Sequence, residues 1–385
     1  MSIKFLYIDD DKTTDIQPFI DELIHFNELQ LEIHHIQTRP MLDIKCQFLA
    51  GHYDGLIIDQ KLDAANENDE IAGYWGTSLA QNFRTEMIGG EVPNSPIVLL
   101  SNEEVFLKYY DADESAHNLF DFTFGKTRVS RCTDYARKAS NIIIGLAQAY
   151  KVARDEVFPL VETESKPFNL FKPLLEWDNE AFEYTDKRFI EHIYSRSNDI
   201  HSLVSLILNT LVRSAGILVT EEMLATKLGI DTNNSTDWDT LKVVLEPYKY
   251  KGAFSNLKER WWMSRIEDWW YEKYDGDQVL RALTAVKRVE AIRLFTSLEN
   301  LMPITPKYSN GKQSEKYWVN CMISGTPLDP YDAVVIRKPD LMPWEQLLYL
   351  DPQITYDRQH REKYSVHPDY QKKVKPLYKR LTDNG

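Results

Sequence analysis

Five residues of types that can handle metal ions and phosphoryl groups stand directly after apolar runs in the first 126 residues. Asp9 and Asp10 follow KFLYI, and Asp59 follows YDGLII. Ser101 follows PIVLL, and Lys126 comes just after the run that begins at residue 120. If the three carboxylates converge, they form an oxygen-rich pocket that suits Mg²⁺, a cation that takes few carboxylates and retains waters. A carboxylate beside such an ion can attack a phosphoryl group and carry it covalently.

The hydroxyl and the amine would complete this chemistry. An incoming phosphoryl group brings negative charge into an already acidic place. A metal ion, Ser101 and Lys126 would each neutralise or hydrogen-bond that charge. The bland alternative is that acids follow strands simply because loops are polar, and Asp11 needs no role at all. Five suitable residue types at five ordered positions favour a site.

Alternating strands and helices are needed to bring these residues together. The hydrophobic spacing predicts strands over 4–8, 31–36, 53–58, 96–100 and 120–124, and helices over 15–26, 41–49, 78–87 and 103–110. This alternation predicts an α/β fold with a five-stranded parallel sheet, doubly wound by helices on both faces. Ligands of such sheets bind at the carboxyl ends of the strands. All five residues should therefore meet at one edge.

At these residues the N-terminal sequence resembles the receiver domains of two-component response regulators. KFLYIDD matches their first strand with its acidic pair, and YDGLIID matches the strand that ends at the phosphate-accepting aspartate. PIVLLS and FGK match the strands that end at the hydroxyl and at the lysine. The resemblance covers residues 1–127 and implies a flavodoxin-like receiver fold.

The resemblance also implies a role for each site residue. Asp59 would accept the phosphoryl group, while Ser101 and Lys126 would contact it. Mg²⁺ would be held by the following ligands: Asp9, Asp10, Asp59 and the backbone carbonyl of Lys61. The sequence departs from the family in a lengthened acidic loop over 60–76, and in Thr127, where the family has proline.

Composition separates this segment from the rest of the chain. Residues 1–126 hold 8 Lys and Arg against 23 Asp and Glu, a net charge of −15, whereas the remainder holds 37 against 36. Three cysteines with no CxxC pair indicate a reducing, cytoplasmic setting. No apolar run approaches the roughly 18 residues that cross a bilayer.

The expected domains are a receiver over 1–127, a long connecting helix over 128–156, a helical effector or adaptor domain over 157–300, and a proline-punctuated subdomain with a basic tail over 301–385.

The C-terminal half is expected to be mainly α-helical with a few short strands. The connecting helix is a candidate homodimer contact, and an ordinary packing helix is the equal alternative. Residues 217–247 resemble a winged helix, but residues 220–247 hold two lysines against six acids, which disfavours DNA binding. Trp261–Trp262 and Trp269–Trp270 are eight residues apart, as on one helix face, and favour core packing over base stacking.

Arg196 and His201 form an R-x4-H pair, a pattern of one class of helical ribonucleases, but chance alone explains one such match.

The resemblance to receiver domains implies a signalling protein. It would receive a phosphoryl group from a histidine kinase or kinase-like ATPase and relay the signal to its effector or adaptor region. The chain also resembles receiver proteins of bacterial antiviral operons, which implies antiphage defence. Two alternatives remain: a pseudo-receiver scaffold that acts without phosphorylation, and a nuclease-like effector enzyme.

Overall fold

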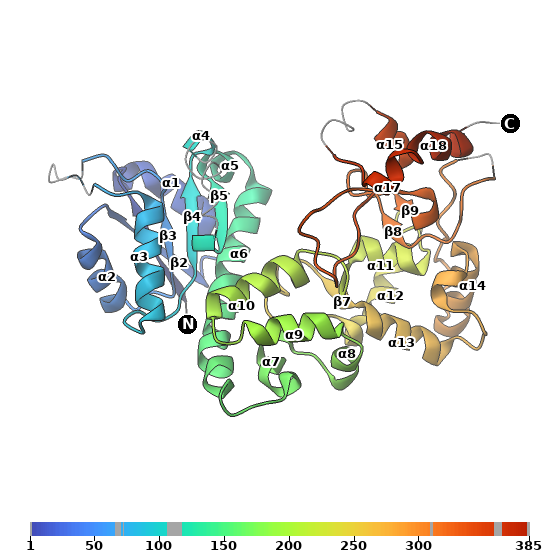
Figure 1. Cartoon of the computed structure of the whole chain (residues 1–385), viewed down its shortest axis with the longest axis horizontal. Helices are drawn as coiled ribbons and strands as arrows, with labels where there is room; N and C mark the ends of the chain where they lie inside the picture. Colours follow the sequence, from blue (N-terminus) through green and yellow to red (C-terminus); the bar gives the residue numbers. More distant parts are fainter. Residues whose placement is uncertain are drawn as a thin grey trace. The chain divides into compact units, whose positions relative to one another are not determined.

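The structure is a computed structural model that describes residues 2–65, 71, 73–105, 118–308, 311–357 and 364–382. It divides the chain into two compact units (Figure 1). Unit 1 comprises Met1–Glu176, His192–Leu208 and Gly252–Leu257, and unit 2 comprises Trp177–Glu191, Asn209–Lys251 and Lys258–Gly385.

Unit 1 contains a five-stranded sheet in which every neighbouring pair of strands is parallel. The strands are β1 (Ile3–Asp9), β2 (Leu31–Gln37), β3 (Gly55–Ile58), β4 (Ile97–Ser101) and β5 (Phe122–Gly125), in the spatial order β2-β1-β3-β4-β5. This order is that of the flavodoxin-like doubly wound fold. The predicted fold class is therefore confirmed, and each strand begins and ends within two residues of its expected bounds.

Helices cover both faces of this sheet, as Figure 1 shows. α2 (Met41–Ala50) and α3 (Gly76–Ile88) lie on one face, and α1 (Thr13–Ile24), α5 (Lys126–Arg131) and α6 (Thr133–Val152) pack together on the other. β1, β3 and β4 are apolar without alternation because both of their faces are buried, and in β1 Phe5, Leu6, Tyr7 and Ile8 are all fully buried. β2 alternates instead, with Leu31, Ile33 and Ile36 buried. α4 is described over Glu103–Val105, and the rest of the helix expected over 103–110 lies outside the described residues.

The helix expected after the sheet is divided in two. Lys126 already begins α5, and Cys132 ends it with an extended backbone, φ −135° and ψ 100°. α6 then buries eleven of its residues and continues into a π-helical turn, Ala153–Val157, and a 3-10 turn, Phe158–Leu160. α7 (Pro167–Leu175) and α10 (Ile200–Leu206) belong to the same unit. α6 thus has the burial of a packing helix, and the homodimer contact stays a prediction.

The remaining elements are mostly helices with short antiparallel strand pairs, as expected. The helices are α8 (Asn179–Glu183), α9 (Lys187–Ser195), α11 (Glu221–Leu228), α12 (Trp238–Val244), α13 (Met263–Lys273), α14 (Ala285–Thr296), α15 (Pro352–Tyr356), α17 (Pro368–Gln371) and α18 (Val374–Thr382). A π-helical turn covers Ile207–Val212, and 3-10 turns cover Glu246–Tyr248, Leu280–Ala282 and Pro330–Asp332. The strand pairs are β6 (Leu218–Thr220) with β7 (Arg260–Trp262), β8 (Val319–Asn320) with β9 (Pro327–Leu328), and β10 (Val334–Val335) with β11 (Tyr349–Leu350).

Sequence signals set the bounds of α11 in unit 2, and the winged-helix-like character of residues 217–247 stays a prediction. The side chain of Thr220 accepts a hydrogen bond from Met223 N and so begins α11, and Gly229, at φ 77°, ends it in the left-handed conformation. The two tryptophan pairs are buried in the core, as expected. They do not share one helix, because Trp261 and Trp262 belong to β7 and the other pair to α13. Within the described part of the chain, no helix has the length and apolarity to span a bilayer.

Candidate functional site: an acidic pocket with a buried lysine

The carboxyl ends of the strands bring the five predicted residues to one edge of the sheet. Asp9 and Ser101 are the last residues of β1 and β4, and Asp59 follows β3 directly. Lys126 follows the last residue of β5. The N–H of Asp59 donates to Ile8 O over 2.9 Å, which fixes the start of the β3 loop against β1. Parallel pairing thus converts four separate strand ends into one pocket.

Lys126 is the cation at the centre of this pocket. Its Nζ lies 2.6 Å from Asp9 Oδ2 and 3.2 Å from Asp59 Oδ1, and all three side chains are buried. Burial opposes the charge on Lys126, but the two carboxylates raise its pKa above the usual value. The buried ammonium of Lys126 is therefore charged, and its two carboxylate partners offset the cost of burying that charge.

Asp59 is a buried carboxyl group whose pKa is set by opposing contacts. Burial and the neighbouring Asp9 raise the pKa of Asp59 to about 6, although Lys126, the Ser101 hydroxyl and the Lys61 N–H all favour its ionised form. The carboxyl group is therefore mostly ionised at neutral pH, and its ionisation lowers the stability of the folded state. A cation or an added donor at this place would stabilise it.

Asp10 completes a carboxylate cluster beside Asp59. One ligand oxygen from each of Asp9, Asp10 and Asp59 can be chosen so that all three lie within 4.8 Å of one another. Burial, with Asp9 and Asp11, raises the pKa of the half-buried Asp10, whose Oδ2 accepts a 2.8 Å hydrogen bond from Ala64 N. Three hard oxygen donors at one point fit Mg²⁺, so the donor set agrees with the cofactor that the sequence predicts.

Lys61 lies in the pocket through its backbone. Its N–H donates to Asp59 Oδ2 over 2.9 Å, while its side chain forms an exposed ion pair with Asp63. This hydrogen bond orients the Asp59 carboxylate. A role for the Lys61 carbonyl as a metal ligand stays a prediction.

Tyr7 belongs to the pocket although the sequence analysis did not select it. Its buried hydroxyl donates to Asp9 Oδ2 over 2.7 Å, and the N–H of Asp11 donates to Asp9 Oδ1 over 3.1 Å. Asp9 therefore accepts three hydrogen bonds, counting that of Lys126. The signal was present in the sequence, because residues two apart on a strand point to the same side.

Two further residues shape the pocket through backbone contacts. A Cβ at Gly76 would lie 2.1 Å from the carbonyl oxygen of Asp59, so only glycine lets α3 begin this close to the β3 loop. Glu103 follows β4, and its Oε1 accepts a 3.1 Å hydrogen bond from Arg128 N at the start of α5. Thr127 also bonds Glu103, which proline could not do through its nitrogen.

Several solved structures resemble the N-terminal part of the chain. These neighbours are receiver domains. That of the Francisella response regulator 1452 shares 19% identity, covers 35% of this chain and 96% of its own, and gives a TM-score of 0.23. That of the putative response regulator NarL from Mycobacterium tuberculosis shares 12% identity over 35% and 96%, with a TM-score of 0.23.

A receiver domain protein from Clostridium thermocellum shares 15% identity, with 36% of this chain and 95% of its own covered and a TM-score of 0.24. No protein-family model and no curated protein matches the chain.

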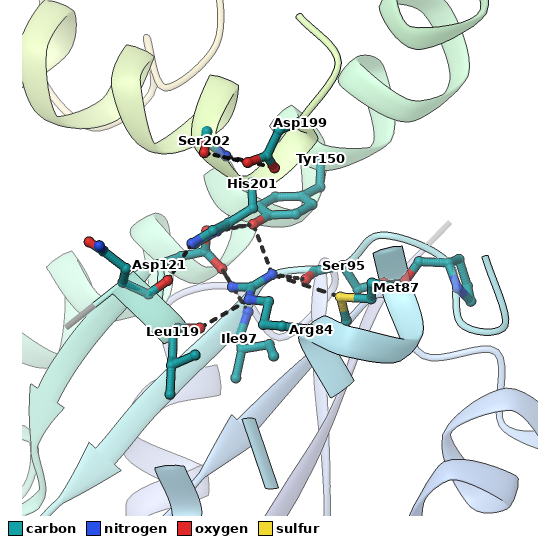
Figure 2. Close-up of polar contacts among 12 residues, drawn as sticks. Arg84, Met87, Ser95, Ile97, Leu119, Asp121, Tyr150, Asp199, His201 and Ser202 are labelled. Atoms are coloured by element: carbon teal, nitrogen blue, oxygen red, sulfur yellow. Dashed lines mark hydrogen bonds and ion pairs between the residues drawn. The ribbon is translucent and has the colours of Figure 1, made fainter. Parts of the chain in front are cut away.

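The R-x4-H pair, which the sequence analysis attributed to chance, does not form a site of its own within unit 1. Arg196 is exposed, whereas His201 is engaged through both ring nitrogens, with Asp121 (Figure 2) and with the carbonyl of Asn118. Neither nitrogen is left to act as a general base on a substrate. The nuclease-like alternative therefore receives no support from this pair.

Proposed function

We propose that the protein is a signalling protein that carries a phosphoryl group on Asp59 in the presence of Mg²⁺. The observation that supports this most is the position of Lys126 Nζ between Asp9 and Asp59, beside a cluster of three carboxylates. A buried nucleophile, a fixed cation and a hard-ion site within one pocket are the parts that phosphoryl transfer needs.

In the proposed reaction a carboxylate oxygen of Asp59 attacks the phosphorus of a phosphohistidine or of acetyl phosphate. The new O–P bond forms as the bond to the leaving nitrogen or oxygen breaks, and its electron pair departs with the leaving group. Lys126 holds one side of the pocket positive, and the hydroxyl of Ser101 is close enough to favour charge on Asp59. Bound Mg²⁺, held by Asp9, Asp10 and Asp59, would neutralise the phosphoryl oxygens.

The donor in the cell would be a histidine kinase or a kinase-like ATPase, and the signal would pass to the effector or adaptor region. The β4 end offers a physical route for such a signal: Ser101 lies in the pocket, and two residues later Glu103 bonds the start of α5. A shift of Ser101 towards an added phosphoryl group would act on that bond. A role in antiphage defence belongs to the same proposal, and the identity of the neighbouring genes would test it.

Labelling with acetyl phosphate tests the phosphoryl step. The full chain is incubated with acetyl phosphate and Mg²⁺, and intact-mass spectrometry detects the gain of one phosphoryl group. Asp59→Asn should abolish the gain and leave the circular dichroism spectrum unchanged. Asp11→Asn removes a charge from an exposed neighbour and should retain labelling. A chelator should abolish labelling in both the wild type and Asp11→Asn.

Two results would overturn the proposal. If the folded wild type takes up no phosphoryl group, the pocket serves as the docking face of a pseudo-receiver. If Asp59→Asn is still labelled at the wild-type level, the acceptor lies elsewhere in the chain.

A further inference from the structure

A tyrosine hydroxyl is buried beside the acidic pocket, in a strand whose two covered faces call for apolar side chains. Tyr7 is fully buried in β1, and Phe5, Leu6 and Ile8 are fully buried beside it without any polar side-chain atom. A buried hydroxyl costs free energy unless it is hydrogen-bonded, so a tyrosine here needs an acceptor that a phenylalanine does not. That acceptor is Asp9, whose Oδ2 accepts from the hydroxyl over 2.7 Å.

The sheet fixes the position of this hydroxyl. Tyr7 is paired with His35 of β2 and with Ile57 of β3 in the register of the parallel strands. The rings of Tyr7 and His35 meet edge to face, with 5.7 Å between their centroids and 73° between their planes. Because Tyr7 and Asp9 are two residues apart on one strand, their side chains point to the same side of the sheet. Burial and the charge of Asp9 raise the pKa of Tyr7 well above its usual value, so the phenol remains a hydrogen-bond donor.

Asp9 Oδ2 is the atom that Tyr7 shares with Lys126. The ammonium nitrogen of Lys126 lies 2.6 Å from this oxygen, 3.2 Å from Asp59 Oδ1 and 4.0 Å from Asp11 Oδ2, so one cation faces three carboxylates. A second donor on Oδ2 stabilises the charge of Asp9 and makes that oxygen a weaker partner for the ammonium. Lys126 is then held less tightly by Asp9 and is available to Asp59.

We propose that Tyr7 is a positioning residue for phosphoryl transfer, whose hydroxyl divides Lys126 between Asp9 and Asp59. This inference rests on the proposed function and deepens it, because Tyr7 acts through Asp9 and Lys126 and not on the phosphoryl group itself. Without the hydroxyl, more of the charge on Asp9 Oδ2 falls to Lys126, and the ammonium moves towards Asp9. It then neutralises less of the charge that develops on the phosphoryl oxygens at Asp59.

A purely structural role for the same hydrogen bond makes a different prediction. Loss of the hydroxyl would then lower the free energy of unfolding, as the loss of any buried hydrogen bond does, and leave the chemistry unchanged. Tyr53 offers a matched control, because its hydroxyl lies 3.0 Å from His34 Nδ1. Tyr53 precedes the first residue of β3, at the end of the strand opposite to the acidic pocket. The kinetics of phosphoryl uptake therefore separate the two roles.

The test compares the wild type, Tyr7→Phe, Tyr7→Met and Tyr53→Phe as full chains. The initial rate of phosphoryl uptake is measured by intact-mass spectrometry at a series of acetyl phosphate concentrations in saturating Mg²⁺. Tyr7→Phe removes the hydroxyl alone, whereas Tyr7→Met removes it with an adaptable apolar side chain in place of the ring. An effect that both variants share is therefore that of the hydroxyl. Urea unfolding gives the stability of each variant separately from its chemistry.

Both Tyr7 variants should lower the maximal rate by about tenfold, the effect of one hydrogen bond to a charged group, and leave the half-saturating acetyl phosphate concentration unchanged. Tyr53→Phe should match the wild type in both quantities. The proposal is overturned if folded Tyr7→Phe retains a maximal rate within about twofold of the wild type, or if only the half-saturating concentration changes. A wild type that takes up no phosphoryl group refutes the proposed function itself, whereas a labelled wild type with an equally fast Tyr7→Phe refutes this inference alone.

Discussion

The ammonium of Lys126 donates to Asp9 Oδ2 over 2.6 Å across the carboxyl edge of the sheet. The two residues are 117 positions apart in the chain, and both are buried. Since Tyr7 donates to the same oxygen, Asp9 is held in place by the fold. The remaining acids of the cluster, Asp10 and Asp59, both have a pKa that burial raises above its usual value.

Asp59→Asn should stabilise the protein at neutral pH. Burial raises the pKa of Asp59 from 3.8 to about 6, so ionising this carboxyl disfavours the folded state. The penalty is absent below about pH 4, grows until about pH 6, and stays constant above it, where it amounts to about 2–3 kcal/mol. Asparagine keeps the shape without the charge. Urea unfolding at several pH values should show the variant more stable at pH 8, with the difference vanishing near pH 4.

Asp11→Asn is the control for this measurement, since Asp11 is exposed and its loss should change stability by less than about 0.5 kcal/mol. A finding that Asp59→Asn is less stable than the wild type at pH 8 would mean that the ion pair with Lys126 outweighs the burial of the carboxylate.

Mg²⁺ should stabilise the folded chain, and more strongly at pH 8 than at pH 5. Metal binding requires ionised ligands, and Asp59 and Asp10 both have raised pKa values. At ten times its dissociation constant the ion contributes about 1.4 kcal/mol. Thermal unfolding with Mg²⁺ or chelator should show the stabilisation in Asp11→Asn and its loss in Asp10→Asn. Equal stabilisation of these two variants would contradict the assignment of Asp10 as a ligand.

The sheet and the pocket could be predicted from the sequence because both depend on local patterns. Apolar runs such as YDGLII are buried on both faces of a parallel sheet, and the residue after each run must then lie at one edge. That reasoning required no knowledge of side-chain packing. It identified Asp59 and Lys126, which the structure brings to 3.2 Å.

Features that depend on contacts between distant parts of the chain could not be predicted. Nothing local in the sequence shows that Gly76 must touch the carbonyl of Asp59, or that Glu103 will accept from Arg128. The break at Cys132 interrupts a helical pattern that is continuous in hydrophobicity. His201 meets Asp121 across 80 positions, and its sequence neighbour Arg196 suggested a different use for it.

Gly76→Ala should disturb both stability and the phosphoryl chemistry. The new Cβ would lie 2.1 Å from Asp59 O, so α3 or the β3 loop must move, at a cost of about 1–3 kcal/mol. Gly89→Ala, at the other end of α3, is the matched control, because its Cβ would meet nothing closer than 3.5 Å. The free energy of unfolding, measured in urea, and the initial rate of acetyl phosphate labelling should both fall for Gly76→Ala and stay unchanged for Gly89→Ala. Normal labelling in a destabilised Gly76→Ala would show that the contact supports the fold and not the position of Asp59.

Glu103→Ala should loosen the start of α5, the helix that Lys126 begins. Glu103 Oε1 accepts from Arg128 N at 3.1 Å, and losing such a cap costs about 1 kcal/mol. Burial opposes the charge, but the bonds from Thr127 and Arg128 hold the pKa of Glu103 below its usual value, so the contribution is present at neutral pH and lost as the pH falls through the acid range. Denaturant unfolding should give Glu103→Ala a lower free energy of unfolding than the wild type at pH 7, and this difference should become smaller at acid pH. Glu104→Ala removes an exposed neighbour of the same charge, and an equal loss in that variant would mean that the net charge of the loop, and not the cap, stabilises α5.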